Sequence, residues 1–218
     1  LALFATALRQ LERRSLQRAR WAIRWYYACA ASLGLGAVLG VLLARGVAWE
    51  HGSLLGAHLA LNLGGWLGTA IVGTLHTFYP SLTRTPLRRP RLQGPTFVAW
   101  TLAVAALAVG YAFDAGAAIA FGWGGLTIAA TLLAVNVAGC ARAAERPLAV
   151  TAKLVGAGQV LLLAGLLVAL AAAVADGPEA PLYDPWRDPV GVLLLAGWVG
   201  LTVAGSLVHL LGVLKRAR

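Results

Sequence analysis

Charged residues are scarce in this chain, and methionine is missing altogether. Asp, Glu, Lys and Arg make up 12% of the 218 residues, hydrophobic residues make up 60%, and the mean hydropathy is +0.77. Soluble domains carry about 25% charged residues. The composition therefore excludes an ordinary soluble protein and predicts an integral membrane protein. The start at Leu1 with no methionine suggests a processed, trimmed or incompletely assigned chain, and the sequence does not tell whether residues precede Leu1.

Several catalytic and transport motifs are also absent from the sequence. It contains no Walker loop, no Gly-x-Gly-x-x-Gly after a strand, no Cys-x-x-Cys and no Glu-x-x-His. Asp114, Asp176 and Glu145 border the apolar segments, so no carboxylate is expected inside the membrane, which argues against a proton-coupled carrier or pump. Cys29 and Cys140 lie within or at the end of apolar runs and predict no disulfide.

Six apolar segments are long enough to cross a hydrocarbon core of about 30 Å. They cover approximately residues 21–43, 53–79, 96–113, 117–141, 148–174 and 190–214, and Pro80 is expected to end the second. Residues 1–20 alternate arginine and leucine at near-helical spacing, which favours a basic amphipathic helix in the interface over a solvated tail. The sequence thus predicts an all-α integral membrane protein, a six-transmembrane-helix bundle over residues 21–218, preceded by a basic interfacial helix over residues 1–20.

The arginines that produce the net charge of +10 flank the apolar segments. This is the pattern of topology determinants and of contacts with anionic lipid, so we expect a lipid bilayer as a partner and no nucleic acid. The N-terminus, the loops around Arg88 and Arg142, and the C-terminus are all basic and fall on one side. The positive-inside rule therefore predicts a multi-pass protein of the cytoplasmic membrane with both termini in the cytoplasm.

The second apolar segment carries polar residues at positions that share one helical face. Steps of three and four residues place these on a single stripe: His58, Asn62, Gly65, Thr69, Gly73 and His76. Polar groups inside a membrane normally face the protein interior, so we predict that the stripe faces inward and forms a functional site. His58 and Asn62 are one turn apart and could bind a ligand together, or could form an interhelical hydrogen bond.

Two further histidines lie near the cytoplasmic ends of their segments. If the second and sixth segments are neighbours, His76 and His209 could face each other and hold a b-type haem or a metal. The alternative is that each imidazole near a helix end binds a carbonyl, a headgroup or water. Asn136 and Gln159 are expected mainly to hold helices together.

The segment around His58 also resembles a known family. The residues HLALNLGGW (58–66) and GTLHTFYP (73–80) resemble a motif in small relatives of haem-copper oxidases, the NnrS-type proteins and the membrane domains attached to multicopper oxidases or nitrite reductases. Those relatives carry His-x-His-x-Asn-Leu-x-Gly-Trp, followed by Gly-Thr-Leu-x-x-x-x-Pro and an arginine. The similarity covers about residues 20–91, with these matches: His58, Asn62, Leu63, Gly65, Trp66, Gly73, Thr74, Leu75, Pro80 and Arg84.

The resemblance departs from the family pattern at one position, where Ala60 replaces the second histidine. It therefore implies at most one cofactor site, a haem b or copper bound through His58. The first functional hypothesis is a haem- or copper-binding membrane protein of a respiratory or nitrogen-oxide electron-transfer system, with a redox partner protein. The second is a non-catalytic anchor subunit that has lost its cofactor sites and packs against other membrane subunits.

Overall fold

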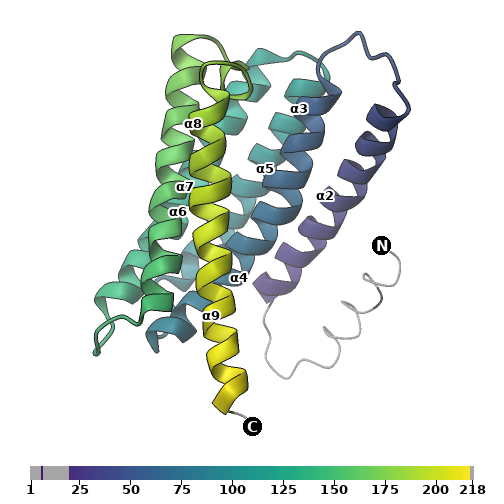
Figure 1. The fold of residues 1–218 in the computed structure, drawn as a ribbon. Coiled ribbons are helices and arrows are strands. Elements are labelled where there is room, and N and C mark those ends of the chain that lie inside the picture. The colour runs from purple at the N-terminus through teal and green to yellow at the C-terminus, as the bar shows by residue number, and fades with distance from the viewer. Residues whose placement is uncertain (1–5, 7–19, 217–218) are drawn as a thin grey trace. The chain divides into compact units, whose positions relative to one another are not determined.

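The computed structural model describes Thr6 and residues 20–216 and is all-α over those residues. Figure 1 shows the long helices, of which six are long and apolar enough to cross a membrane: Trp21–Ala44, Leu54–Thr83, Pro90–Ala112, Gly116–Arg142, Val150–Ala175 and Arg187–Lys215. The predicted all-α, six-helix membrane architecture is confirmed. The predicted interfacial helix over residues 1–20 lies outside the described residues, apart from Thr6 and Arg20.

The first of two compact units comprises Leu1–Thr74 and Phe97–Leu126. It contains α2 (Arg20–Ala44), α3 (Leu54–Leu59), η1 (Ala60–Gly68), most of α5 (Gln93–Ala112) and the start of α6 (Gly116–Arg142). The second transmembrane helix begins where the Ser53 hydroxyl accepts a hydrogen bond from the Gly56 N–H at 3.0 Å, a typical N-cap. Within this unit α2 packs along α3 and η1, which makes a helical hairpin (Figure 1).

The second unit comprises Leu75–Thr96 and Thr127–Arg218. It contains the end of α4 (Thr69–Thr83), the short η2 (Pro90–Leu92), the end of α6, and a second hairpin. In that hairpin α7 (Val150–Ala175) packs along η4 (Val192–Gly200) and α9 (Leu201–Arg216) (Figure 1). A loop with η3 (Ala180–Leu182) and α8 (Arg187–Gly191) connects its two helices.

Two of the transmembrane helices contain a π-helical segment. Each segment is nine residues long, η1 between α3 and α4, and η4 between α8 and α9. A π-helix has a wider turn than an α-helix and is rare, usually limited to a single turn. The helical stripe predicted from a regular period therefore passes through an irregular segment at its centre.

The prediction that Pro80 ends the second transmembrane helix is wrong. Helix α4 continues through Pro80 to Thr83, and Arg84 then adopts a left-handed conformation with φ of 55°. Proline has no backbone N–H, so Pro80 cannot donate to the carbonyl of His76 four residues earlier, a loss that membrane helices tolerate. The Ser81 and Thr83 hydroxyls donate to the neighbouring carbonyls of Thr77 and Tyr79 at 3.0 and 3.1 Å.

Candidate functional site

The polar stripe of the second transmembrane helix faces inward, as predicted. Four members are buried, namely Gly65, Thr69, Gly73 and His76, and His58 and Asn62 are half-buried. Side chains on other faces of the same helix are exposed, with 56% of Leu55 and 44% of Trp66 accessible. The stripe is therefore not directed at lipid.

Helix α2 covers the outer part of this stripe at positions with little or no side chain. A Cβ atom added at Gly36 would lie 2.5 Å from Asn62 Nδ2, and one at Gly40 would lie 2.9 Å from His58 Cε1. Closer to the middle of α2 the glycine is on the other helix: a Cβ atom added at Gly65 would lie 2.6 Å from Ser32 Cβ. The small-xxx-small pair Gly36 and Gly40 thus lets the backbone of α2 approach the polar residues directly.

The imidazole of His58 is held by a backbone carbonyl of α2. Its Nδ1 atom lies 2.9 Å from the carbonyl oxygen of Gly36. A carbonyl can only accept a hydrogen bond, so Nδ1 carries the proton and donates it. In the neutral ring this tautomer leaves a lone pair on Nε2, which is the atom that can bind a metal.

The side chain of Asn62 lies against the same ring. Its amide nitrogen donates to the backbone carbonyl of His58 at 2.9 Å. The same nitrogen is nearly equidistant from the two ring nitrogens of His58, at 3.3 Å from Nδ1 and 3.5 Å from Nε2. An atom so placed lies in line with neither nitrogen lone pair, so Asn62 braces the ring and leaves the direction of Nε2 open.

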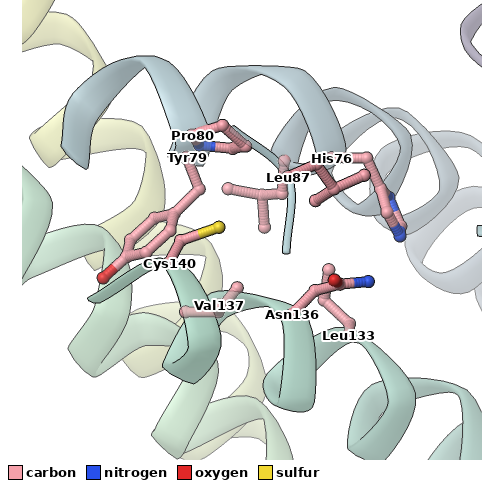
Figure 2. Close-up of a pocket in the computed structure, with 9 residues that line it drawn as sticks. His76, Tyr79, Pro80, Leu87, Leu133, Asn136, Val137 and Cys140 are labelled. Carbon is pink, nitrogen blue, oxygen red and sulfur yellow. The ribbon is translucent and has the colours of Figure 1, made fainter. Parts of the chain in front are cut away.

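His76 belongs to a different environment, a crevice in the second unit. The His76 ring, from α4, and the Asn136 amide, from α6, both enter this crevice. Leu87 lies over it and belongs to the basic loop, residues 84–89, which connects α4 to η2 (Figure 2). Both polar side chains are nearly inaccessible, with 3% of His76 and 2% of Asn136 exposed. The space between the atoms of the crevice is about 160 Å³, including the part that is open to the surroundings. None of it is wide enough to hold a water molecule.

Asn136 fastens the basic loop to α6. Its Oδ1 atom accepts a hydrogen bond from the backbone N–H of Arg89 at 2.9 Å, while its Nδ2 atom has no hydrogen-bond partner among the described residues. The Cys140 thiol donates to the carbonyl of Pro86 at 3.7 Å, which fixes the same loop. The sequence did not reveal this role, because an asparagine that bonds a distant loop has no local signature.

His209 does not face His76. The His209 ring packs edge-on against Phe78, with ring centroids 5.6 Å apart and an interplanar angle of 81°. His76 and Phe78 are two residues apart on α4, and consecutive residues of an α-helix are about 100° apart, so the two side chains leave α4 on opposite sides. The arrangement that would let both histidines hold one haem is therefore not formed.

The structure confirms that Gln159 holds two helices together. Its amide donates to Thr202 Oγ1 and to the carbonyl of Val155, both at 3.1 Å, and its Oε1 accepts from the Trp198 indole at 3.2 Å. Gln159, Trp198 and Thr202 are all buried. A fully bonded amide of this kind is a packing element between α7 and the helix formed by η4 and α9.

Comparisons with protein-family models, with curated protein sequences and with solved structures found no match to this chain. The functional argument therefore depends on the geometry of the site. Of the predicted site residues, the structure brings His58 and Asn62 together, and it places His76 and His209 in separate surroundings.

Proposed function

We propose that this chain is a component of a respiratory or nitrogen-oxide electron-transfer system and that His58 attaches a b-type haem. The observation that carries the proposal is the hydrogen bond from His58 Nδ1 to the Gly36 carbonyl, which places the ring lone pair on Nε2, the atom that would bind iron; the Asn62 amide nitrogen lies 3.5 Å from it. Histidines that bind metals usually donate their other ring N–H to a carbonyl or carboxylate in this way. The resemblance of residues 20–91 to small haem-copper oxidase relatives supports the same assignment.

We propose haem rather than copper as the group that His58 would hold. A haem is bound by its ring as well as by iron, so one imidazole suffices, and the bound group would accept and pass on single electrons. Protein copper sites combine several imidazole or sulfur ligands. The chain contains no methionine, and the described residues include no group of three His, Cys, Asp or Glu side chains able to hold a metal.

A haem protein of this kind must exchange electrons with another protein or membrane subunit. The half-buried His58 belongs to the second transmembrane helix, near its start at Leu54. The basic N-terminal and C-terminal segments support an orientation with both termini in the cytoplasm, in the cytoplasmic membrane. In that orientation His58 lies in the outer leaflet, where an external redox partner can approach it.

The second candidate function is a non-catalytic anchor subunit of a larger membrane complex. It is favoured by the close cover that α2 gives the stripe at Gly36, Gly40 and Ser32, since this packing already uses His58 and Asn62. Apolar side chains on α2 are open to the surroundings, with 59% of Leu35, 57% of Val38 and 56% of Val41 exposed. In this function a neighbouring subunit would cover that face.

An absorbance spectrum of the purified protein distinguishes the two functions. We expect a haem Soret band in the wild type, its loss in His58→Ala, and its retention in His209→Ala and His51→Ala. A Soret band that survives His58→Ala would contradict the assignment of the ligand. A colourless preparation that co-purifies with other membrane chains would refute the haem function and support the anchor function.

A further inference from the structure

One short sequence recurs in the second, fourth and sixth transmembrane helices. Residues 65–75 read GWLGTAIVGTL, residues 122–132 read GWGGLTIAATL, and residues 197–207 read GWVGLTVAGSL. All three share Gly-Trp-x-Gly at the start and Leu at the end, with Ile or Val at the seventh position and Thr or Ser at the tenth. Recurrence of the same pattern in alternate helices is the signature of an internal repeat.

The three segments lie in the second helix of three helical hairpins, numbered here in chain order. The first is α2 with α3 and η1, the second is α5 with α6, and the third is α7 with η4 and α9. In each hairpin a glycine on the first helix meets the residue three positions before the Gly-Trp pair. The contacts are Gly36 with Asn62, Gly110 with Ile119, and Gly165 with Leu194, and a Cβ atom added at the glycine would lie 2.5, 2.6 and 2.6 Å from the partner side chain. The repeat in sequence is therefore also a repeat in packing.

The first and third hairpins agree at two further contacts. Ser32, four residues before Gly36, meets Gly65, and Leu161, four residues before Gly165, meets Gly197. Trp25, eleven residues before Gly36, meets Gly73, and Leu154, eleven residues before Gly165, meets Gly205 beside the closer Val155.

The π-helical segments occupy the same positions in these two hairpins. Both η1 and η4 begin five residues before the Gly-Trp pair and end at the second glycine of the repeat, Gly68 or Gly200. Neither π-helix contains a histidine, since His58 lies in α3 just before η1. The wide turn thus belongs to the shared hairpin and is not by itself a sign of a binding site.

We propose that the membrane domain consists of three copies of one helical hairpin, and that His58 and Asn62 are binding residues added to the first copy. The corresponding positions hold Val190 and Leu194 in the third copy; in the second copy Ile119 matches Asn62, while Ala115, which matches His58 by sequence, lies in the turn before α6. The hairpin therefore packs with apolar residues at these positions, and the polar pair is not needed for packing. That the bound molecule is a haem rests on the proposed function, whereas the triplication stands on the contacts alone.

The chain itself supplies the residues for the test. A double variant, His58→Val with Asn62→Leu, gives the first copy the residues of the third. We expect it to fold in detergent with a thermal midpoint within about 2 °C of haem-free wild type, because bound haem would itself stabilise the folded state. Such a shift corresponds to about 0.5–1 kcal/mol in a chain of this size. We also expect it to lose the Soret band that the wild type has under the proposed function.

Three matched glycine variants test the triplication. Gly36→Ala, Gly110→Ala and Gly165→Ala each add a methyl group at the equivalent contact, and we expect each to lower the midpoint by about 4 °C or more. Gly124→Ala, which meets nothing within 4 Å, is the control and should leave the midpoint unchanged or raise it.

The possible failures can be told apart. If any of the three glycine variants behaves like Gly124→Ala, the three hairpins are not equivalent and the triplication is wrong. If the double variant is destabilised as strongly as the glycine variants, His58 and Asn62 are packing residues and the second half of the proposal is wrong. If the wild type contains no haem, the proposed function fails, while the comparison of midpoints still decides both halves of this inference.

Discussion

His58 Nδ1 lies 2.9 Å from the carbonyl oxygen of Gly36, so a backbone group of α2 sets the tautomer of an imidazole on the following transmembrane helix. This bond depends on the absence of a side chain at Gly36, because a Cβ atom there would meet the amide of Asn62. Gly36, which the sequence suggested as a packing residue, therefore orients His58, which the sequence suggested as a cofactor ligand.

The Asn62→Leu variant tests whether Asn62 supports the His58 ring or only fills space between the two helices. Leu194 occupies the equivalent position of the third hairpin, so the leucine should be accommodated against Gly36. Interhelical polar contacts in membrane proteins contribute about 0.6 kcal/mol on average, so we expect a loss of stability below about 1 kcal/mol. We also expect a Soret band that is shifted but present, because His58 keeps its bond to Gly36. Absorbance and thermal unfolding in detergent measure both quantities, and complete loss of the haem would show that Asn62 is itself indispensable.

Gln159→Leu should destabilise the α7 hairpin. The substitution removes the acceptor of the Trp198 indole and the donor to Thr202, both in a buried setting. A double-mutant cycle with Thr202→Val should give a coupling energy of about 0.6 kcal/mol, within a ceiling of about 1.7 kcal/mol for such bonds. Unfolding in mixed micelles gives these energies. A coupling energy of zero would mean that the 3.1 Å contact does not stabilise the protein.

Asn136→Ala should release the basic loop from α6. The backbone N–H of Arg89 would lose its acceptor, and Leu87 would lose the anchor that holds it over the crevice. We expect faster tryptic cleavage after Arg84 and Arg88, followed by mass spectrometry. Gln93→Ala is the matched amide control, because Gln93 reaches only Pro90 of the same loop at 3.5 Å. Equal cleavage rates in the two variants would contradict the anchoring role.

The orientation in the membrane can be tested with single cysteines. The native Cys29 and Cys140 are buried and can be replaced by serine to give a background without reactive thiols. Arg88→Cys and Glu145→Cys should then react with an impermeant maleimide only in inverted vesicles, whereas Glu50→Cys and Glu179→Cys should react in intact cells. The opposite pattern would reverse the predicted topology and place His58 on the cytoplasmic side.

Spacing alone predicted which face of the second transmembrane helix is buried. The steps from His58 to His76 follow the helical period closely, and a polar residue in a membrane has few alternatives to facing protein. The same reasoning missed the π-helical segment at Ala60–Gly68, because nothing in this apolar, glycine-rich sequence distinguishes a π-helix from an α-helix. It also predicted that the helix ends at Pro80, whereas α4 continues through Pro80 to Thr83.

Sequence patterns did not predict the contacts between segments that are distant in the sequence. The pairing of His76 with His209 assumed that residues at equal depth face each other, but Phe78 takes the position against His209. The bond between Asn136 and Arg89 joins a helix to a loop that is far away in sequence, and no local period encodes it. Both outcomes depend on the rotation of each helix about its own axis, which is set by the packing of all its neighbours.

The spin state of the iron in the purified protein tests the central claim most directly. Under the proposed function His58 would be the one imidazole that holds the iron, so electron paramagnetic resonance of the oxidised protein should show one high-spin b-type haem per chain. The signal should vanish in the His58→Val, Asn62→Leu double variant and persist in His209→Ala. A low-spin signal typical of two imidazoles, or a chain with no iron at all, would contradict the account.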